Sequence, residues 1–249
     1  MIVKLSHYPI LQLKMAIQLQ IIVSRQYYLK DPQSTDLGEG IVRNGILLFD
    51  QLGFEDFTFK KLAEEIGSTE ASIYRYFDNK RRFLLYITAM YWRWLDYLVD
   101  YNTHHIENSE NRLRTTLQII CDPNKFGNDQ VKIFDSEALK RVVMAESDKT
   151  YLTKDVDEIN KEGLFRAYKD FCQKVACMIK VINPDYPYAH SLVSTALEAS
   201  NQQVFFAMHL PSLTELKEDG SNPGDLREQV FKFIEHTVFK LILPNGTSK

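Results

Sequence analysis

The sequence has few cysteines, no long apolar run and no surplus of positive charge. Its three cysteines, Cys121, Cys172 and Cys177, form neither an even set nor a metal-ligand spacing, so we expect reduced thiols and no zinc site. No stretch approaches the roughly 20 apolar residues of a membrane span. The apolar N-terminus lacks the small-residue cleavage site of a signal peptide. We therefore expect a cytoplasmic protein with no membrane partner.

Motifs for catalysis and cofactor binding are also missing. The chain contains no Gly-rich phosphate loop, nucleophile elbow or His-Glu-x-x-His pair. His104 and His105 are adjacent, so they would not face one side of a helix, and no acid or cysteine stands at ligand spacing around them. The sequence thus predicts no enzyme, no cofactor and no catalytic or metal-binding residue.

Two short helical patterns separated by a tight break occupy residues 58–77. Thr58 suits an N-cap before an apolar face, Gly67 can end that helix in a left-handed conformation, and Thr69 can cap a second one. A helix, a short Gly-containing turn and a second helix make a helix-turn-helix, in which the second helix enters the DNA major groove. An ordinary helical hairpin in a core fits the spacing equally well.

The run from Ile41 to Leu84 resembles the DNA-binding domain of TetR-family transcriptional regulators, and its ending from Tyr74 to Lys80, Tyr-x-Tyr-Phe-x-x-Lys, is its most distinctive part. The run departs from the family pattern at Gly45, Ser68 and Glu70. Glu70 leaves the DNA preference open, because a carboxylate near phosphate costs affinity unless it accepts a hydrogen bond from cytosine. The predicted DNA-binding residues are Thr58, Lys60, Thr69, Glu70, Ala71, Ser72, Tyr74, Arg75, Tyr76 and Lys80.

The charge of this region is unusual for a DNA-binding domain. Residues 35–82 contain seven basic and nine acidic side chains, a net charge of −2, whereas such domains usually carry a basic footprint. Our explanation is positional: the acids lie mainly on the first two helices, and the bases Lys80, Arg81 and Arg82 cluster after the recognition helix. The alternative function is a helical protein-interaction module that uses the helix-turn-helix scaffold without specific DNA binding.

Three regions are predicted in an all-α chain. Residues 1–33 form an N-terminal extension, either a hairpin or an arm that packs on the protein or touches DNA, and Met15 is a possible alternative start. Residues 34–82 form the DNA-binding domain, and residues 83–249 form a helical ligand-binding and dimerisation domain. One apolar stripe predicts a long helix over residues 80–105 that links the two domains. Further helices are predicted over residues 112–120, 131–145, 159–182, 188–209 and 225–243.

The resemblance implies a homodimer through the last two long helices, which binds a near-palindromic operator on double-stranded DNA. The small residues of helix 188–209 suit close helix packing and favour the dimer over the alternative, in which these helices form intramolecular core. The resemblance also implies that a small effector, largely apolar or aromatic, controls operator affinity, most simply by releasing a repressor. The predicted ligand-binding residues are Tyr91, Trp94, Leu98, His105, Phe134, Phe165, Tyr168, Asn201 and Phe205.

Overall fold

A computed structural model describes residues 21–127, 134–217 and 223–243. These residues form helices and no strand, which confirms the all-α prediction. The α-helices are α1 Asp36–Asp56, α2 Phe59–Glu65, α3 Glu70–Tyr74, α4 Lys80–Thr103, α5 Ser109–Cys121, α6 Ser136–Ala145, α7 Ser147–Tyr151, α8 Val156–Lys161, α9 Arg166–Ile182, α10 Ala189–His209 and α11 Pro223–Ile242. Short 3-10 turns are η1 Arg25–Tyr27, η2 Pro32–Ser34, η3 Pro123–Phe126 and η4 Pro211–Leu213.

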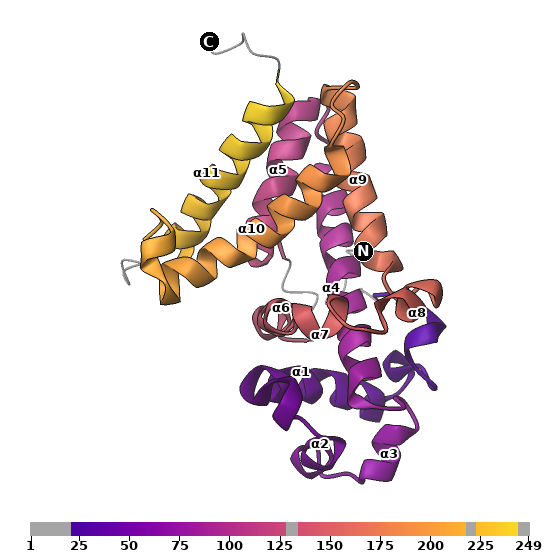
Figure 1. Ribbon diagram of the computed structural model, residues 1–249. Coiled ribbons are helices and arrows are strands. Elements are labelled where there is room, and N and C mark those ends of the chain that lie inside the picture. Colours follow the sequence, from indigo (N-terminus) through magenta and orange to yellow (C-terminus); the bar gives the residue numbers. More distant parts are fainter. Residues whose placement is uncertain (1–20, 128–133, 218–222, 244–249) are drawn as a thin grey trace, which may run out of the picture.

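Helices α1, α2 and α3 form one end of the molecule, and α4 rises from them into the remaining helices (Figure 1). The Thr35 hydroxyl caps α1 by accepting from the backbone N–H of Gly38 at 3.1 Å. At the other end Gly53, with a φ of 70°, interrupts the regular helix. A left-handed φ is accessible to glycine because it has no Cβ.

The core of this end is aromatic. The Phe57 ring stacks on Phe49 with centroids 4.0 Å apart and on Phe83 with centroids 5.8 Å apart. Phe83 belongs to the first turn of α4, so these contacts join the long helix to α1. Gly45 on α1 faces the same ring: a Cβ at this position would lie 2.5 Å from Cζ of Phe83. The glycine at this position therefore lets α1 approach α4 closely.

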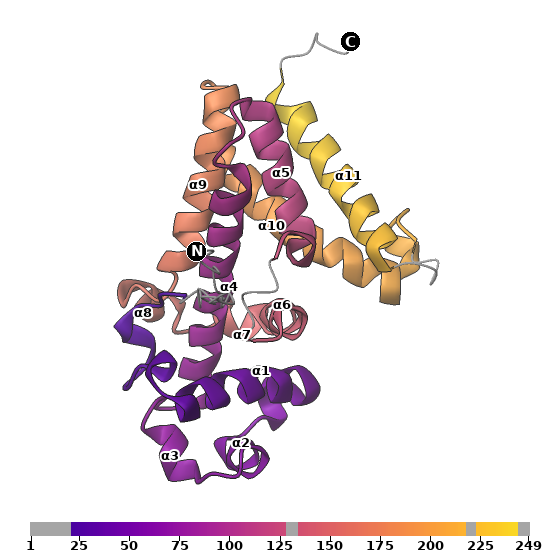
Figure 2. The ribbon, with the colours of Figure 1, turned by 180° about the vertical axis from the view of Figure 1, so that it is seen from behind.

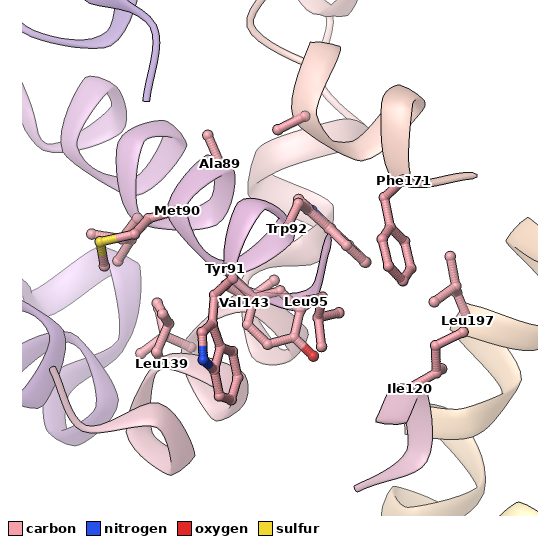
Figure 3. Packing of buried hydrophobic residues seen from close by; sticks show 14 of the residues in the cluster. Ala89, Met90, Tyr91, Trp92, Leu95, Ile120, Leu139, Val143, Phe171 and Leu197 are labelled. Carbon is pink, nitrogen blue, oxygen red and sulfur yellow. The ribbon is translucent and has the colours of Figure 1, made fainter. Parts of the chain in front are cut away.

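Helix α4 is the central rod. Its 24 residues span about 36 Å, and the Asn79 side chain caps its start by accepting from the N–H of Arg82 at 2.9 Å. All residues from Phe83 to Trp92 are buried, because α1, α5, α6 and α9 pack around the rod. Tyr91, Trp92 and Leu95 of α4 pack among side chains of α5, α6, α9 and α10 in the shared core (Figure 3).

Two helical predictions need correction. The single helix expected over residues 159–182 is broken, because Gly163 has a φ of 76° and ends α8 before α9 begins. The helix expected from residue 131 begins at Ser136, where the Asp135 carboxylate caps it by accepting from the N–H of Ala138; residues 131–133 lie outside the described residues. Helix α7 was not predicted.

The last two helices, α10 and α11, meet at a corner on the far side of the body from α9, and α11 returns alongside α5 (Figures 1 and 2). Both agree closely with the predicted ranges 188–209 and 225–243. Helix α10 packs on α9 and α11, and α11 also packs on α5. Among the described residues, no helix has the length and apolarity needed to span a membrane.

The described part of the N-terminal extension packs on the protein rather than forming a strand pair. Ile21, Val23 and Tyr27 are buried, and the Tyr27 hydroxyl donates to the backbone carbonyl of Leu164 beside α9. Burial raises the pKa of Tyr27 to about 12. Residues 17–20 of the predicted hairpin lie outside the described residues.

Candidate nucleic-acid interface

Each step of the predicted helix-turn-helix has its local cause in the structure. The Thr58 hydroxyl accepts from the N–H of Lys61 at 3.2 Å and starts α2. Gly67, with a φ of 62°, ends it, and the next N–H, of Ser68, donates back to the Ala63 carbonyl at 2.8 Å. The Thr69 hydroxyl then accepts from the N–H of Ser72 at 3.3 Å and starts α3.

Helix α3 has one buried face and one open face. Ile73 is fully buried, and Phe77 just beyond the helix is buried as well. Thr69, Glu70 and Ala71 of the first turn are exposed. Since the first turn of a recognition helix contacts base edges, the three small or acidic side chains lie where such a helix reads DNA.

The remaining predicted residues of this surface differ in accessibility. Ser72 is half-buried, and its hydroxyl lies 2.8 Å from that of Thr69. The Tyr74 ring packs edge-on against Phe59 with centroids 5.1 Å apart, yet the side chain remains 47% exposed. Lys60 and Arg75 are exposed, and neither forms an ion pair within the described part of the chain. These two cations are free to meet phosphate.

Tyr76 and Lys80, both predicted to contact phosphate, have protein partners instead. Tyr76 is only 2% exposed, and its hydroxyl lies 2.8 Å from that of Thr35. The Lys80 ammonium donates to three backbone carbonyls where α1 ends, those of Phe54, Glu55 and Phe57, at 2.7, 3.0 and 3.3 Å. It also lies 4.6 Å from the centre of the Phe54 ring. An ammonium has three donors, so this lysine is fully occupied with the end of α1.

The neighbouring arginines face the residues that flank α8. Arg81 pairs with Asp155 at 2.9 Å and donates to the Thr153 hydroxyl at 2.6 Å, while Arg82 pairs with Glu162 at 2.9 Å. Our positional explanation of the acidic balance is therefore wrong in its basic half. The three bases that follow the recognition helix bind protein groups rather than forming a positive footprint.

Three further contacts join α1 to the segment α6–α7. Arg141 donates to both carboxylate oxygens of Asp50, at 2.6 to 3.2 Å. The backbone N–H of Phe54 donates to the Glu146 carboxylate at 2.8 Å, and Lys149 pairs with Glu55 at 3.0 Å. We call the contacts of Arg81, Arg82, Arg141, Glu146 and Lys149 with their partners the domain junction.

The predicted ligand-binding residues do not form a single group. Trp94 lies between Tyr91 and Phe134, with centroids 6.1 and 5.9 Å away, and all three are buried. Phe165 and Tyr168 form a second cluster around Tyr151, with centroids 5.4 and 5.2 Å from its ring. Trp92 connects this cluster to α4 by stacking on Tyr168 at 4.4 Å and by donating from its indole N–H to the Tyr151 hydroxyl.

The other four predicted ligand-binding residues have different surroundings. Leu98 is core, at 1% exposure, and the amide of Asn201 donates to the Leu197 carbonyl of its own helix. His105 is exposed, and Phe205 is 52% exposed beside His209. Of the nine, Tyr91, Trp94 and Phe134 form one connected ring cluster, and two of these rings belong to α4.

A partly buried lysine of α6, Lys140, was not among the residues that the sequence predicted for this region. The Lys140 ammonium of α6 donates to the carbonyl of Cys121, the last residue of α5, at 2.9 Å. Burial lowers the pKa of this amine to about 8. Arg227 of α11 forms ion pairs with the nearby carboxylates of Asp122 and Glu137, each at 2.7 Å. Within the described ranges no group of three or more His, Cys, Asp or Glu side chains could hold a metal.

Comparison with known proteins points to one family. No curated protein matches the chain. A solved structure from Mesorhizobium loti MAFF303099, assigned to the TetR family of transcriptional regulators, aligns with 86% of this chain and 97% of its own at 13% identity and a TM-score of 0.45. Residues 41–87 match the family described as bacterial regulatory proteins, tetR family, and this segment holds the helix-turn-helix and the start of α4. Residues 41–87 of the chain thus carry a DNA-binding domain of the kind found in TetR-family transcriptional regulators.

Proposed function

We propose that this protein is a homodimeric repressor that reads a near-palindromic operator with α3 and is released by a small apolar or aromatic effector. The observation that carries the proposal is the open first turn of α3, where Thr69, Glu70 and Ala71 are exposed while Ile73 anchors the opposite face. A helix fixed on one side and open on the other can enter a major groove without losing its core contacts.

Base reading falls to the first turn of α3 in this proposal. The Thr69 and Ser72 hydroxyls can donate to or accept from base edges, and the Ala71 methyl can contact thymine. The Glu70 carboxylate is an acceptor only, so it favours a cytosine amino group. Lys60, Arg75 and the Tyr74 hydroxyl supply contacts to phosphates, which position the helix without specifying sequence. Thr58 is fixed as the cap of α2.

The proposed dimer face lies on α10 and α11. Thr195, Glu198, Gln202 and Phe205 recur at steps of three or four along the exposed side of α10, and Phe205 and Met208 leave 52% and 49% of their surfaces open. On α11, Phe233 and Leu241 are 41% and 52% exposed. A face with small residues near one end and large apolar ones near the other suits a two-fold helix bundle, which would set two α3 helices at half-sites of an inverted repeat.

The proposed effector site lies at Tyr91, Trp94 and Phe134. These aromatic rings supply the apolar surface that ligand pockets usually present, and two of them belong to the rod that carries the recognition helix. Replacing Trp94 with alanine should abolish the effector response while leaving operator affinity intact. An unchanged response in a folded Trp94→Ala variant would place the effector elsewhere.

Coupling between the two sites runs through α4 and the domain junction in this proposal. Helix α4 begins beside α3 and passes the aromatic cluster about three turns later. The junction contacts of Arg81 and Arg141 bind the same two domains from either side of the rod. An effector that favours another position of α6 would therefore act on both connections together.

The experiment that tests this function is selection of bound duplexes from a random DNA library at modest salt, followed by sequencing. An enriched inverted repeat supports a dimeric, sequence-specific regulator, and the spacing of its half-sites reports the dimer geometry. Absence of any enriched sequence, with all binding lost on a small increase in salt, contradicts the proposal. The acidic balance of residues 35–82 would then favour the protein-interaction module.

A further inference from the structure

The N-terminal extension reaches the end of the recognition helix. The backbone N–H of Leu29 donates to the Tyr76 carbonyl at 2.8 Å, and Tyr76 stands two residues beyond the last residue of α3. The Lys30 ammonium lies over the Tyr76 ring, 5.1 Å from its centre. A segment outside the matched family region thus places a cation beside α3.

This cation is available, unlike those that follow α3. Lys30 is exposed, and no carboxylate lies within 4.0 Å of its ammonium among the residues that the structure describes. The Lys80 ammonium donates its three hydrogen bonds to backbone carbonyls at the end of α1, and the Tyr76 hydroxyl is hydrogen-bonded to that of Thr35. The two side chains expected to meet phosphate at this end of α3 are therefore occupied, and Lys30 lies on top of one of them.

The local structure also fixes the position of Lys30. The Tyr28 ring packs edge-on against Tyr86 of α4 with centroids 6.0 Å apart, and Gln33 donates to the Ile21 carbonyl at 2.7 Å and to the Tyr86 hydroxyl at 3.3 Å. The Asp31 carboxylate caps η2 by accepting from the N–H of Gln33. Lys30 therefore projects from a backbone that is held on both sides, so ordering it on DNA costs little extra conformational entropy.

We propose that Lys30 contacts the DNA backbone at the C-terminal end of α3, in the place that the sequence pattern assigns to Tyr76 and Lys80. The partner is a phosphate of the duplex that α3 reads, and the contact adds affinity and no base preference. This inference rests on the proposed DNA binding by α3, and it gives the N-terminal extension a part in it.

The test compares the salt dependence of binding for matched variants on two duplexes, one selected from the random library and one of scrambled sequence. Each protein–phosphate contact releases counterions from the DNA. Losing one contact per chain therefore makes the negative slope of log K against log salt shallower by about 0.9 per chain. Lys30→Ala should make the slope shallower by that amount and weaken binding to both duplexes by the same factor. Lys30→Arg should restore both quantities, whereas Lys30→Met should not.

Two controls separate this contact from a structural role. Arg25→Ala removes another exposed cation of the extension, located on η1 next to the second domain, and should leave the slope unchanged. Lys80→Ala should lower the free energy of unfolding, since three carbonyls lose their donor, with no change in slope. A Lys30→Ala slope equal to that of the unaltered protein overturns the proposal while DNA binding stands. Failure of the unaltered protein to bind either duplex overturns both.

Discussion

Three glycines on α1 provide a graded test of how the DNA-binding domain is packed. Each can be changed to alanine, and the same added methyl group meets three different surroundings. At Gly40 nothing lies within 4 Å of the new Cβ. At Gly45 the Cβ would lie 2.5 Å from Cζ of Phe83, and at Gly38 it would lie 2.2 Å from the backbone oxygen of Pro32. The substitution is constant, so differences in stability report packing.

The magnitudes follow from two opposing terms. Alanine stabilises a helix interior by about 1 kcal/mol relative to glycine, and Gly40→Ala should gain that amount. At Gly45 the same gain opposes overpacking, which costs about 1–3 kcal/mol. The Phe83 ring has little room to move because Phe57 and Phe77 lie on it, with centroids 5.8 and 5.0 Å away. We therefore expect Gly45→Ala to destabilise the protein by about 0–2 kcal/mol.

Gly38→Ala should be the most damaging of the three. Its methyl group would collide with backbone rather than with the end of a side chain, so η2 has to separate from α1. Urea unfolding should rank the midpoints as Gly40→Ala, unaltered protein, Gly45→Ala and Gly38→Ala, from highest to lowest. Replacing the Phe83 ring by the smaller leucine side chain in the Gly45→Ala background should recover part of the lost stability. Equal stabilisation by Gly40→Ala and Gly45→Ala would refute the close approach of α1 to α4.

The remaining predictions concern charge. Removing Asp50 and Arg141 singly and together should give a coupling energy of about 0.2–1 kcal/mol, since the Arg141 side chain is 58% exposed and lets water screen the pair, although Asp50 is only 20% exposed. A coupling that persists unchanged in 1 M salt, where the Debye length is about 3 Å, would contradict an electrostatic contact. The Lys140 amine has a folded pKa of about 8, below its usual value of 10.5. Between these values the unfolded chain holds a proton that the folded chain has released, so the contribution of this lysine to stability rises with pH from about 8 to about 10.5. Lys140→Met should lack this rise, as unfolding midpoints measured across that range for both proteins can establish.

The parts of the site that the sequence predicted are those with local causes. Thr58, Gly67 and Thr69 act on backbone groups within five residues of themselves, so their roles can be read from spacing. The break at Gly163 has the same local form, because the N–H of Leu164 donates back to the Ile159 carbonyl at 3.2 Å. It was missed because the apolar stripe continues on both sides of the glycine and suggests one helix.

The roles of Tyr76 and Lys80 depend instead on partners distant in sequence. Thr35 precedes Tyr76 by 41 residues, and the Phe54 carbonyl precedes Lys80 by 26 residues. A motif states which residue types recur at which spacing, and it carries no information on whether a neighbouring segment has already used a donor. The same reason explains why Arg81 and Arg82, read as part of a basic footprint, face Asp155 and Glu162.

The acidic balance of the DNA-binding domain has a measurable consequence for binding. With Lys80, Arg81 and Arg82 engaged by protein groups, the exposed cations near α3 that have no ion pair within the described ranges are Lys30, Lys60 and Arg75. Three phosphate contacts per chain predict a slope of about −2.7, or about −5 for a dimer on its operator. Opening the domain junction would free both arginines and make the slope steeper. The test is to replace Asp155 by Asn and Glu162 by Gln and to measure the slope again. A steeper slope would indicate that the ion pairs of the junction keep the two arginines from contacting DNA. An unchanged slope would show that these arginines lie beyond reach of the duplex even when free.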